Sequence, residues 1–164
     1  MSDDLLGTAG DWEPPRFALA TTVYVERDGQ ILLLRRATGT AFAGQWFLPG
    51  GAVDEGETPE EGARRELLEE AGLTIDGELE LVGAYLMEVY GGRSLALSYR
   101  GRAAAGEAVT SDEHDGARWV DPREMRATLS DEFITDLSAG NERAATIVRN
   151  VRDDLDRYLR RIGT

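Results

Sequence analysis

The sequence predicts one α/β domain, because strand-like and helix-like segments alternate along it. Residues 17–26 and 30–36 are rich in β-branched and aliphatic side chains and flank an Arg-Asp-Gly turn signal, which is typical of a β-hairpin. Residues 59–71 carry the caps of a helix, and apolar residues recur at helical spacing over 141–162. The 164 residues match the size of one ordinary domain.

The first helix has signals at both ends. Thr58 is a good N-cap, Pro59 occupies the first helical position, and Glu61 completes a capping box. Gly72 is a fitting C-cap, and Leu73 is placed to close a Schellman-type turn. We therefore expect a helix from 59 to 71.

Shorter segments complete the prediction. Residues 46–48 lead into the breaker Pro-Gly-Gly, and residues 78–90 and 94–100 are predicted strands joined by a Gly-Gly turn. A short strand is expected at 117–120, and Pro122 begins a short helix that ends near Ala127.

The domain is expected to cover residues 16–164, after a mobile N-terminal arm at 1–15 that is polar and ends in two prolines. Its last element is an amphipathic helix at about 141–162, which we expect to pack against the domain or a partner subunit. A homodimer is therefore possible. The apolar positions of this helix are Ala144, Val148, Val151, Leu155, Leu159 and Ile162.

Composition restricts the classes of function. The net charge of −13 disfavours binding to nucleic acids and to anionic membranes. No apolar run is long enough to span a bilayer and no signal peptide is visible, so a cytoplasmic location is expected. The chain has no cysteine and one histidine, His114, so a metal must be held by oxygen, which favours Mg²⁺ or Mn²⁺.

Three carboxylates of the predicted helix, those of Glu66, Glu69 and Glu70, stand at positions i, i+3 and i+4. This spacing places them on one helix face within about 5–6 Å of each other, where like charges destabilise the helix. A hard divalent cation reverses that effect by drawing the oxygens together. The alternative interpretation is a solvated acidic face, which is common in a chain with 31 acidic residues.

A longer pattern encloses these carboxylates. Its fixed positions are Gly51, Glu57, Arg65, Glu66, Leu67, Glu69, Glu70, Gly72 and Leu73. This pattern resembles the signature of the Nudix hydrolases, a MutT-like family, and every fixed position of that signature is matched. The run Trp46-Phe47-Leu48-Pro49-Gly50-Gly51 and the later Arg118-Trp119-Val120 also resemble the family, so the likeness covers most of residues 17–127.

The resemblance implies an α/β/α sandwich with a mixed sheet, in which the signature forms a loop–helix–loop beside the site. It implies that Arg65 pairs with Glu57 and holds the catalytic helix in register with its loop. It also implies one to three Mg²⁺ ions, with Mn²⁺ as a possible substitute. The implied ligands are the carboxylates of Glu66, Glu69 and Glu70 and the carbonyl of Gly51.

The implied activity is Mg²⁺-dependent hydrolysis of a diphosphate linkage in a small nucleotide-like substrate, by attack of water on phosphorus. The general base is either Glu66 or Glu113, which lies in the loop 111–115. The substrate is an NTP or dNTP, a dinucleoside polyphosphate, ADP-ribose or a nucleotide sugar. The alternative is a catalytically silent nucleotide sensor on the same fold, although degenerate domains typically lose a signature acid and none is lost here.

Three further residues are candidate substrate contacts. Arg35 and Arg36 end a predicted strand that points toward the signature loop, and a guanidinium there can bind a phosphate with two parallel hydrogen bonds. Tyr90 lies 17 residues beyond Leu73, where family members that act on dinucleoside polyphosphates often carry a tyrosine.

Overall fold

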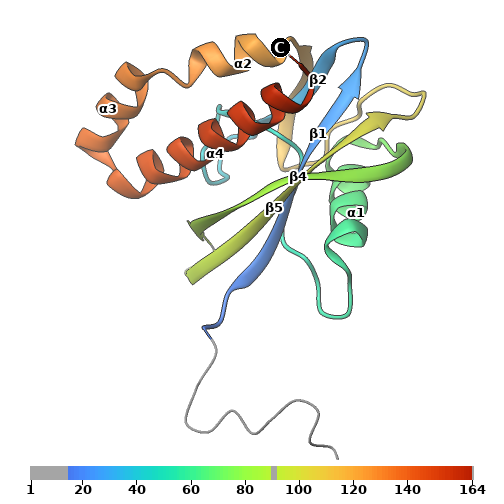
Figure 1. The fold of residues 1–164 in the computed structure, drawn as a ribbon, viewed down its shortest axis with the longest axis horizontal. Helices are drawn as coiled ribbons and strands as arrows, with labels where there is room; N and C mark the ends of the chain where they lie inside the picture. The colour runs from blue at the N-terminus through green and yellow to red at the C-terminus, as the bar shows by residue number, and fades with distance from the viewer. Residues whose placement is uncertain (1–14, 90–91, 164) are drawn as a thin grey trace, which may run out of the picture.

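The computed structural model describes residues 15–89 and 92–163, so Tyr90 and residues 1–14 of the predicted arm lie outside the described residues. In chain order the elements are β1 (Ala18–Arg27), β2 (Gln30–Arg36), β3 (Trp46–Phe47), α1 (Pro59–Ala71), β4 (Ile75–Val89), β5 (Gly92–Ala103), β6 (His114–Val120), α2 (Pro122–Thr128), α3 (Asp131–Gly140) and α4 (Glu142–Arg161). Figure 1 shows α1 on one side of the strands and the other helices on the opposite side.

The strands form a six-stranded sheet with the order β3-β2-β1-β5-β4, and β6 pairs with β2. Strands β1 and β5 run parallel, whereas the β1–β2, β2–β3, β2–β6 and β4–β5 pairs are antiparallel. The predicted mixed sheet is therefore confirmed.

Strands β1 and β2 separate beyond their turn, and the segment that follows β3 lies against β1. The Thr21 amide donates to the Gly51 carbonyl at 2.8 Å, and the Val23 amide donates to the Pro49 carbonyl at 2.9 Å. Between these contacts, a Cβ on Gly50 would lie 2.0 Å from the Thr21 carbonyl oxygen. Only glycine allows this approach, which fixes the Gly50-Gly51 pair on the sheet.

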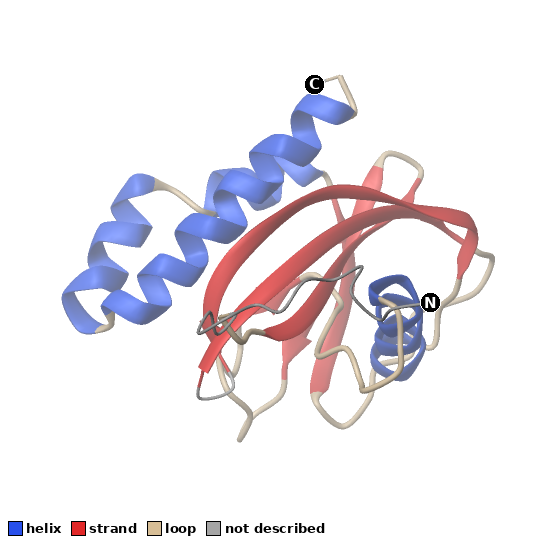
Figure 2. Cartoon of the chain, turned by 60° about the horizontal axis from the view of Figure 1, so that its bottom comes forward, coloured by secondary structure: helices blue, strands red, loops and turns tan. Residues whose placement is uncertain are grey.

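Both faces of the sheet are covered, as Figure 2 shows. Alternate residues of β1 point to opposite faces. Val23 and Val25 share a buried cluster with Leu67 of α1, and Tyr24 shares another with Leu155 of α4. Each fully buried side chain of this kind contributes roughly 1.5–3 kcal/mol. This arrangement is the α/β/α sandwich that the signature predicts.

Helix α1 has the predicted bounds and caps. The Thr58 side chain accepts from the Glu61 amide, and the Glu61 side chain accepts from the Thr58 amide at 2.8 Å. Gly72 ends the helix with φ 63°, and its amide donates to the Leu68 carbonyl at 2.9 Å. The local sequence therefore determines this helix.

Several elements differ from the prediction, among them β5, which extends beyond the expected 94–100 at both ends. Strand β4 begins three residues earlier than expected, because its Asp-Gly-Glu stretch is accommodated by a register irregularity rather than by a turn. Strand β6 begins at His114, where it pairs with Arg36. Helix α3 was not predicted, since its sequence lacks a clear helical repeat and its buried Ile134 packs against α4 and Leu129.

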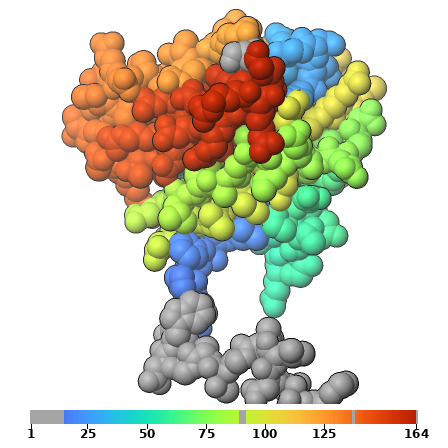
Figure 3. All heavy atoms as spheres, viewed as in Figure 1, coloured from blue at the N-terminus to red at the C-terminus, as the bar shows by residue number. Residues whose placement is uncertain are grey.

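Helix α4 packs along β4, and Figure 3 shows it in red beside the green strand. Its Asp154 is 1% exposed and accepts hydrogen bonds from Tyr24 Oη at 3.0 Å and Ser98 Oγ at 2.8 Å. Tyr158 stacks on Tyr24 with ring centroids 4.1 Å apart. These contacts fix α4 on the sheet. Across the described ranges, no helix is both long and apolar enough to cross a membrane.

Candidate active site

A cleft of about 650 Å³ lies between the signature helix, the sheet and the start of α4. Its polar end is lined by Arg36, Glu66, Glu70, Glu113 and His114. All five side chains are ionisable, and they belong to the predicted site or to its neighbouring loop. The cleft thus collects charges that are far apart in the sequence.

Glu70 is the most buried acid of the cleft. The residue is 8% exposed, and its Oε2 accepts a hydrogen bond from the Gly50 amide at 2.8 Å. Burial raises the pKa of its carboxyl group from 4.5 to about 8, and the nearby Glu66 adds to the rise. Burial also raises the pKa of the Glu66 carboxyl group, against the opposing effect of Arg65.

Gly51 lies directly against the carboxyl group of Glu66. A Cβ at this position would be 2.5 Å from Glu66 Cδ, a distance at which one of the two groups must move. The Gly51 carbonyl accepts one hydrogen bond from Thr21, which leaves its second lone pair for another partner.

Arg65 connects the loop before α1 with the acids on the helix. Its guanidinium donates to both carboxylate oxygens of Glu57, at 2.8 and 3.0 Å, and to the Ala52 carbonyl at 2.9 Å. The same side chain reaches Glu66 at 2.9 Å and Glu69 at 3.2 Å. Arg65 therefore lies between two of the three acids that the signature brings together.

Glu69 lies apart from the other two carboxylates. Its side chain is 59% exposed, and it is absent from the lining of the cleft. In residues 15–89 and 92–163 no three acidic or histidine side chains are grouped closely enough to hold a metal ion. Of the three helix acids, Glu66 and Glu70 line the cleft, and carboxylate oxygens of this kind suit Mg²⁺.

Glu113 and His114 reach the cleft from the start of β6. Glu113 Oε2 accepts a hydrogen bond from Arg36 Nη1 at 2.9 Å. Arg36, the predicted phosphate contact, is thus paired with Glu113, one of the two candidate bases. His114 is 5% exposed, and its Nε2 lies 3.7 Å from Glu70 Oε1. Burial and the nearby Arg36 lower the pKa of His114. The sequence left open whether His114 acts as a base or phosphate contact or is an incidental loop residue, and the pairing of β6 with β2 brings it to the site.

The two arginines at the end of β2 diverge, because neighbouring strand residues face opposite sides of a sheet. Arg36 lines the cleft. Arg35 does not line the cleft. Its Nε donates a hydrogen bond to Asp115 Oδ1 at 2.6 Å, and its guanidinium lies 5.6 Å from the centroid of the Trp46 ring. The sequence placed both arginines equally near the signature loop.

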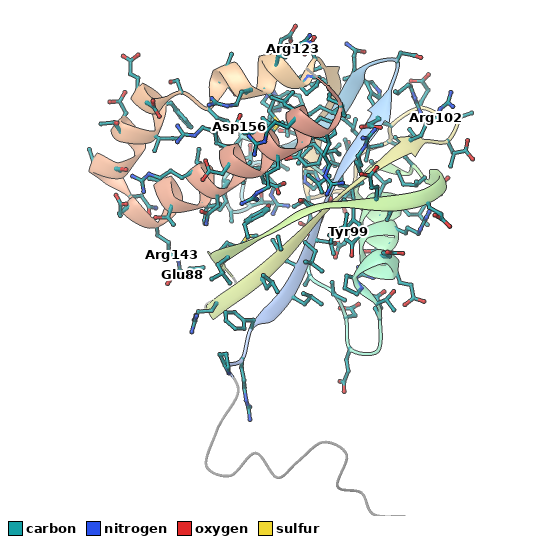
Figure 4. All side chains as sticks on the ribbon, viewed as in Figure 1. Glu88, Tyr99, Arg102, Arg123, Arg143 and Asp156 are labelled. Atoms are coloured by element: carbon teal, nitrogen blue, oxygen red, sulfur yellow. The ribbon has the colours of Figure 1, made fainter. Side chains whose placement is uncertain are left out.

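The cleft also has apolar lining residues. Phe42 and Phe47 are two of them, and Ile147 of α4 adds to the wall. Glu88 and Arg143 lie side by side where β4 ends (Figure 4), and Arg143 Nε donates to the Glu88 carbonyl at 2.8 Å. The contribution of α4 was missed, since helical periodicity identifies a buried face but not what borders it.

Comparisons with known proteins agree with this architecture. The NUDIX domain model matches residues 16–137. A MutT-like protein of Streptomyces ambofaciens is 33% identical over 138 residues, which cover 84% of this chain and 85% of that protein. An oxidized purine nucleoside triphosphate hydrolase of Danio rerio is 42% identical over 97 residues, covering 58% of this chain and 61% of its relative.

A solved structure extends the similarity over nearly the whole chain. The crystal structure of the MutT protein from Methanosarcina mazei Go1 superimposes with a TM-score of 0.70 at 25% identity, covering 90% of this chain and 96% of that one. Helix α4 lies beyond the residues that the family model matches. The family match, the relative of similar length and the shared fold together show that this chain belongs to the Nudix hydrolase family.

Proposed function

We propose that this protein hydrolyses a diphosphate linkage in a nucleoside diphosphate derivative, with Mg²⁺ as its cofactor and water as the nucleophile. The observation that carries the proposal is the pair of buried carboxyl groups, Glu66 and Glu70, beside Gly51 in a cleft that also holds Arg36. Two adjacent acids with raised pKa values are costly for a fold, and a divalent cation offsets that cost.

The proposed metal ligands are Glu66, Glu70 and the Gly51 carbonyl, joined by Glu69 once its exposed side chain turns from Arg65. Mn²⁺ would serve as a substitute, because it accepts the same oxygen donors. When bound, the cation supplies charge neutralisation for the phosphoryl oxygens and makes water easier to deprotonate.

The remaining site residues bind and orient the substrate. Arg36 would contact a phosphate oxygen, and its ion pair with Glu113 places that carboxylate beside the same phosphate. We therefore prefer Glu113 over Glu66 as the base that accepts the proton of water. Arg65 would act as a positioning residue, because its two bonds to Glu57 hold the loop in register with α1.

The substrate that we favour is a purine nucleoside triphosphate. This choice is supported by the name of the Danio rerio relative, an oxidized purine nucleoside triphosphate hydrolase. A cleft of about 650 Å³ also accommodates a molecule of nucleotide size.

The test is a substrate panel of dGTP, 8-oxo-dGTP, ADP-ribose, a dinucleoside polyphosphate and a nucleotide sugar, with MgCl₂ or with EDTA. Release of orthophosphate, pyrophosphate and AMP identifies the phosphorus that is attacked. We expect Mg²⁺-dependent turnover that Glu66→Gln or Glu113→Gln lowers at least about 100-fold, because the first variant loses a proposed metal ligand and the second the proposed proton acceptor. Glu60→Gln, on an exposed position of α1, is the matched control. Nucleotide binding without turnover of any substrate would refute the enzyme and favour the sensor.

A further inference from the structure

Phe42 has an unusual backbone conformation at the edge of the cleft. Its φ is 60°, and in the described part of the chain Asp28 is the one other non-glycine residue with positive φ. Asp28 belongs to the tight turn before Gly29, where a short polar side chain tolerates this conformation. A bulky aromatic residue does not, so the conformation of Phe42 is unfavourable unless the surrounding loop imposes it.

Hydrogen bonds do impose the shape of this loop. The Arg36 amide donates to the Gln45 carbonyl at 3.0 Å, and the Gly44 amide donates to the Arg36 carbonyl at 2.8 Å. The Gln45 amide in turn donates to the Phe42 carbonyl at 3.0 Å. The loop is therefore a closed, bonded structure that fixes the backbone of Phe42.

The ring itself is poorly covered. Phe42 is 43% exposed, although it is a large apolar residue, and its described aromatic contact is an edge-on one with Phe47. The two ring centroids are 5.6 Å apart with an interplanar angle of 73°, and both residues line the cleft. Packing within the fold thus leaves a large part of Phe42 uncovered.

The position of the ring matches the order of groups in a nucleotide. Arg36, which is our phosphate contact, donates through Nε to the carbonyl of Ala41 at 3.3 Å, directly before Phe42. The phosphate-binding cation and the exposed ring are thus neighbours along one wall. A base linked to its phosphates through a sugar has the same arrangement, with a flat apolar group next to an anionic one.

We infer that Phe42 is the stacking platform for the nucleobase of the substrate, a role that rests on the function proposed above. The base lies against the Phe42 ring while the phosphates extend past Arg36 toward Glu66 and Glu70. This platform selects nucleotides over diphosphates that carry no aromatic group, because stacking needs a π-face but no particular base edge.

The test compares Phe42→Asn with Phe42→Tyr. Asparagine accepts a positive φ, so this variant loses the ring without backbone strain, whereas tyrosine keeps the ring. Phe133→Asn is the matched control, since Phe133 is 38% exposed but lies on α3 and does not line the cleft. The probes are dGTP, ADP-ribose and inorganic tripolyphosphate, which carries the phosphates without a base.

For Phe42→Asn we expect the KM of both nucleotides to rise roughly 5- to 150-fold, the range measured when base stacking is removed. The inhibition constant of tripolyphosphate and the unfolding temperature should stay unchanged, and Phe42→Tyr and Phe133→Asn should behave like the wild type. A KM that is equal in the Asn and Tyr variants would overturn the platform, as would a parallel loss of tripolyphosphate binding. A wild-type protein that turns over no nucleotide would instead overturn the proposed function, and the platform with it.

Discussion

Replacing Glu70 with glutamine removes the charge of the most buried acid in the cleft while preserving its shape. The amide oxygen of the variant can still accept the hydrogen bond that Glu70 takes from the Gly50 amide at 2.8 Å. The rise in the Glu70 pKa from 4.5 to about 8 corresponds to on the order of 5 kcal/mol of unfavourable free energy for ionising the buried carboxyl group. Relaxation of the cleft will reduce this figure, so a difference of a few kcal/mol is expected.

The pH dependence of stability follows from the direction of the pKa shift of Glu70. Because the pKa is higher in the folded protein, Glu70 favours folding while it is protonated, and this stability is lost as the pH rises from about 4.5 through about 8. Without metal, Glu70→Gln should therefore match the wild type at pH 5 and exceed it in stability at pH 9. With Mg²⁺ the advantage of the variant should shrink, because the wild type gains about 2.7 kcal/mol at a metal concentration 100 times its Kd.

Urea unfolding followed by circular dichroism, at pH 5, 7 and 9 with EDTA or with Mg²⁺, measures these differences. Taking the difference between variant and wild type cancels the titration of groups that do not interact with Glu70. Glu60→Gln is the control, because Glu60 is exposed on α1 and lies outside the lining of the cleft. The variant Glu70→Gln should also lose Mg²⁺-dependent turnover. Lower stability of this variant at pH 9 without metal would refute the reasoning.

Further predictions concern the glycine of the site, the anchor of α4 and the pH profile. Gly51→Ala brings a Cβ within 2.5 Å of Glu66 Cδ, so kcat/KM should fall about 100-fold, whereas Gly140→Ala, with nothing within 4 Å, should leave activity unchanged. In Asp154→Asn, the new amide NH₂ group would face the hydroxyl groups of Tyr24 and Ser98, which donate hydrogen bonds to Asp154 in this buried site. The free energy of unfolding measured in urea should fall by about 1–3 kcal/mol, whereas Asp153→Asn, at an exposed position, should change it little. Activity should rise from pH 6 to 9 because the raised pKa values of the cleft carboxyl groups delay their ionisation; a fall over this range would contradict the assignment.

Several features of the protein can be identified only from its folded structure. Arg35 and Arg36 are adjacent in sequence and equal in chemistry, and only the orientation of β2 shows that Arg36 faces the cleft. His114 had no distinctive sequence context, yet β6 brings it to Glu70. Asp154 belongs by composition to a polar helix face, but it is buried because Tyr24 and Ser98 supply its hydrogen bonds from the sheet.

The family, the fold class and the signature helix follow from the sequence alone, because caps, turn residues and side-chain spacing act over a few residues and can be recognised there. Thr58, Glu61 and Gly72 bound α1 without help from the rest of the chain. The tertiary structure alone decides which groups share the cleft and how deeply each is buried. Burial and long-range strand pairing set the pKa of Glu70 and the position of Phe42, and neither property is contained in any short stretch of residues.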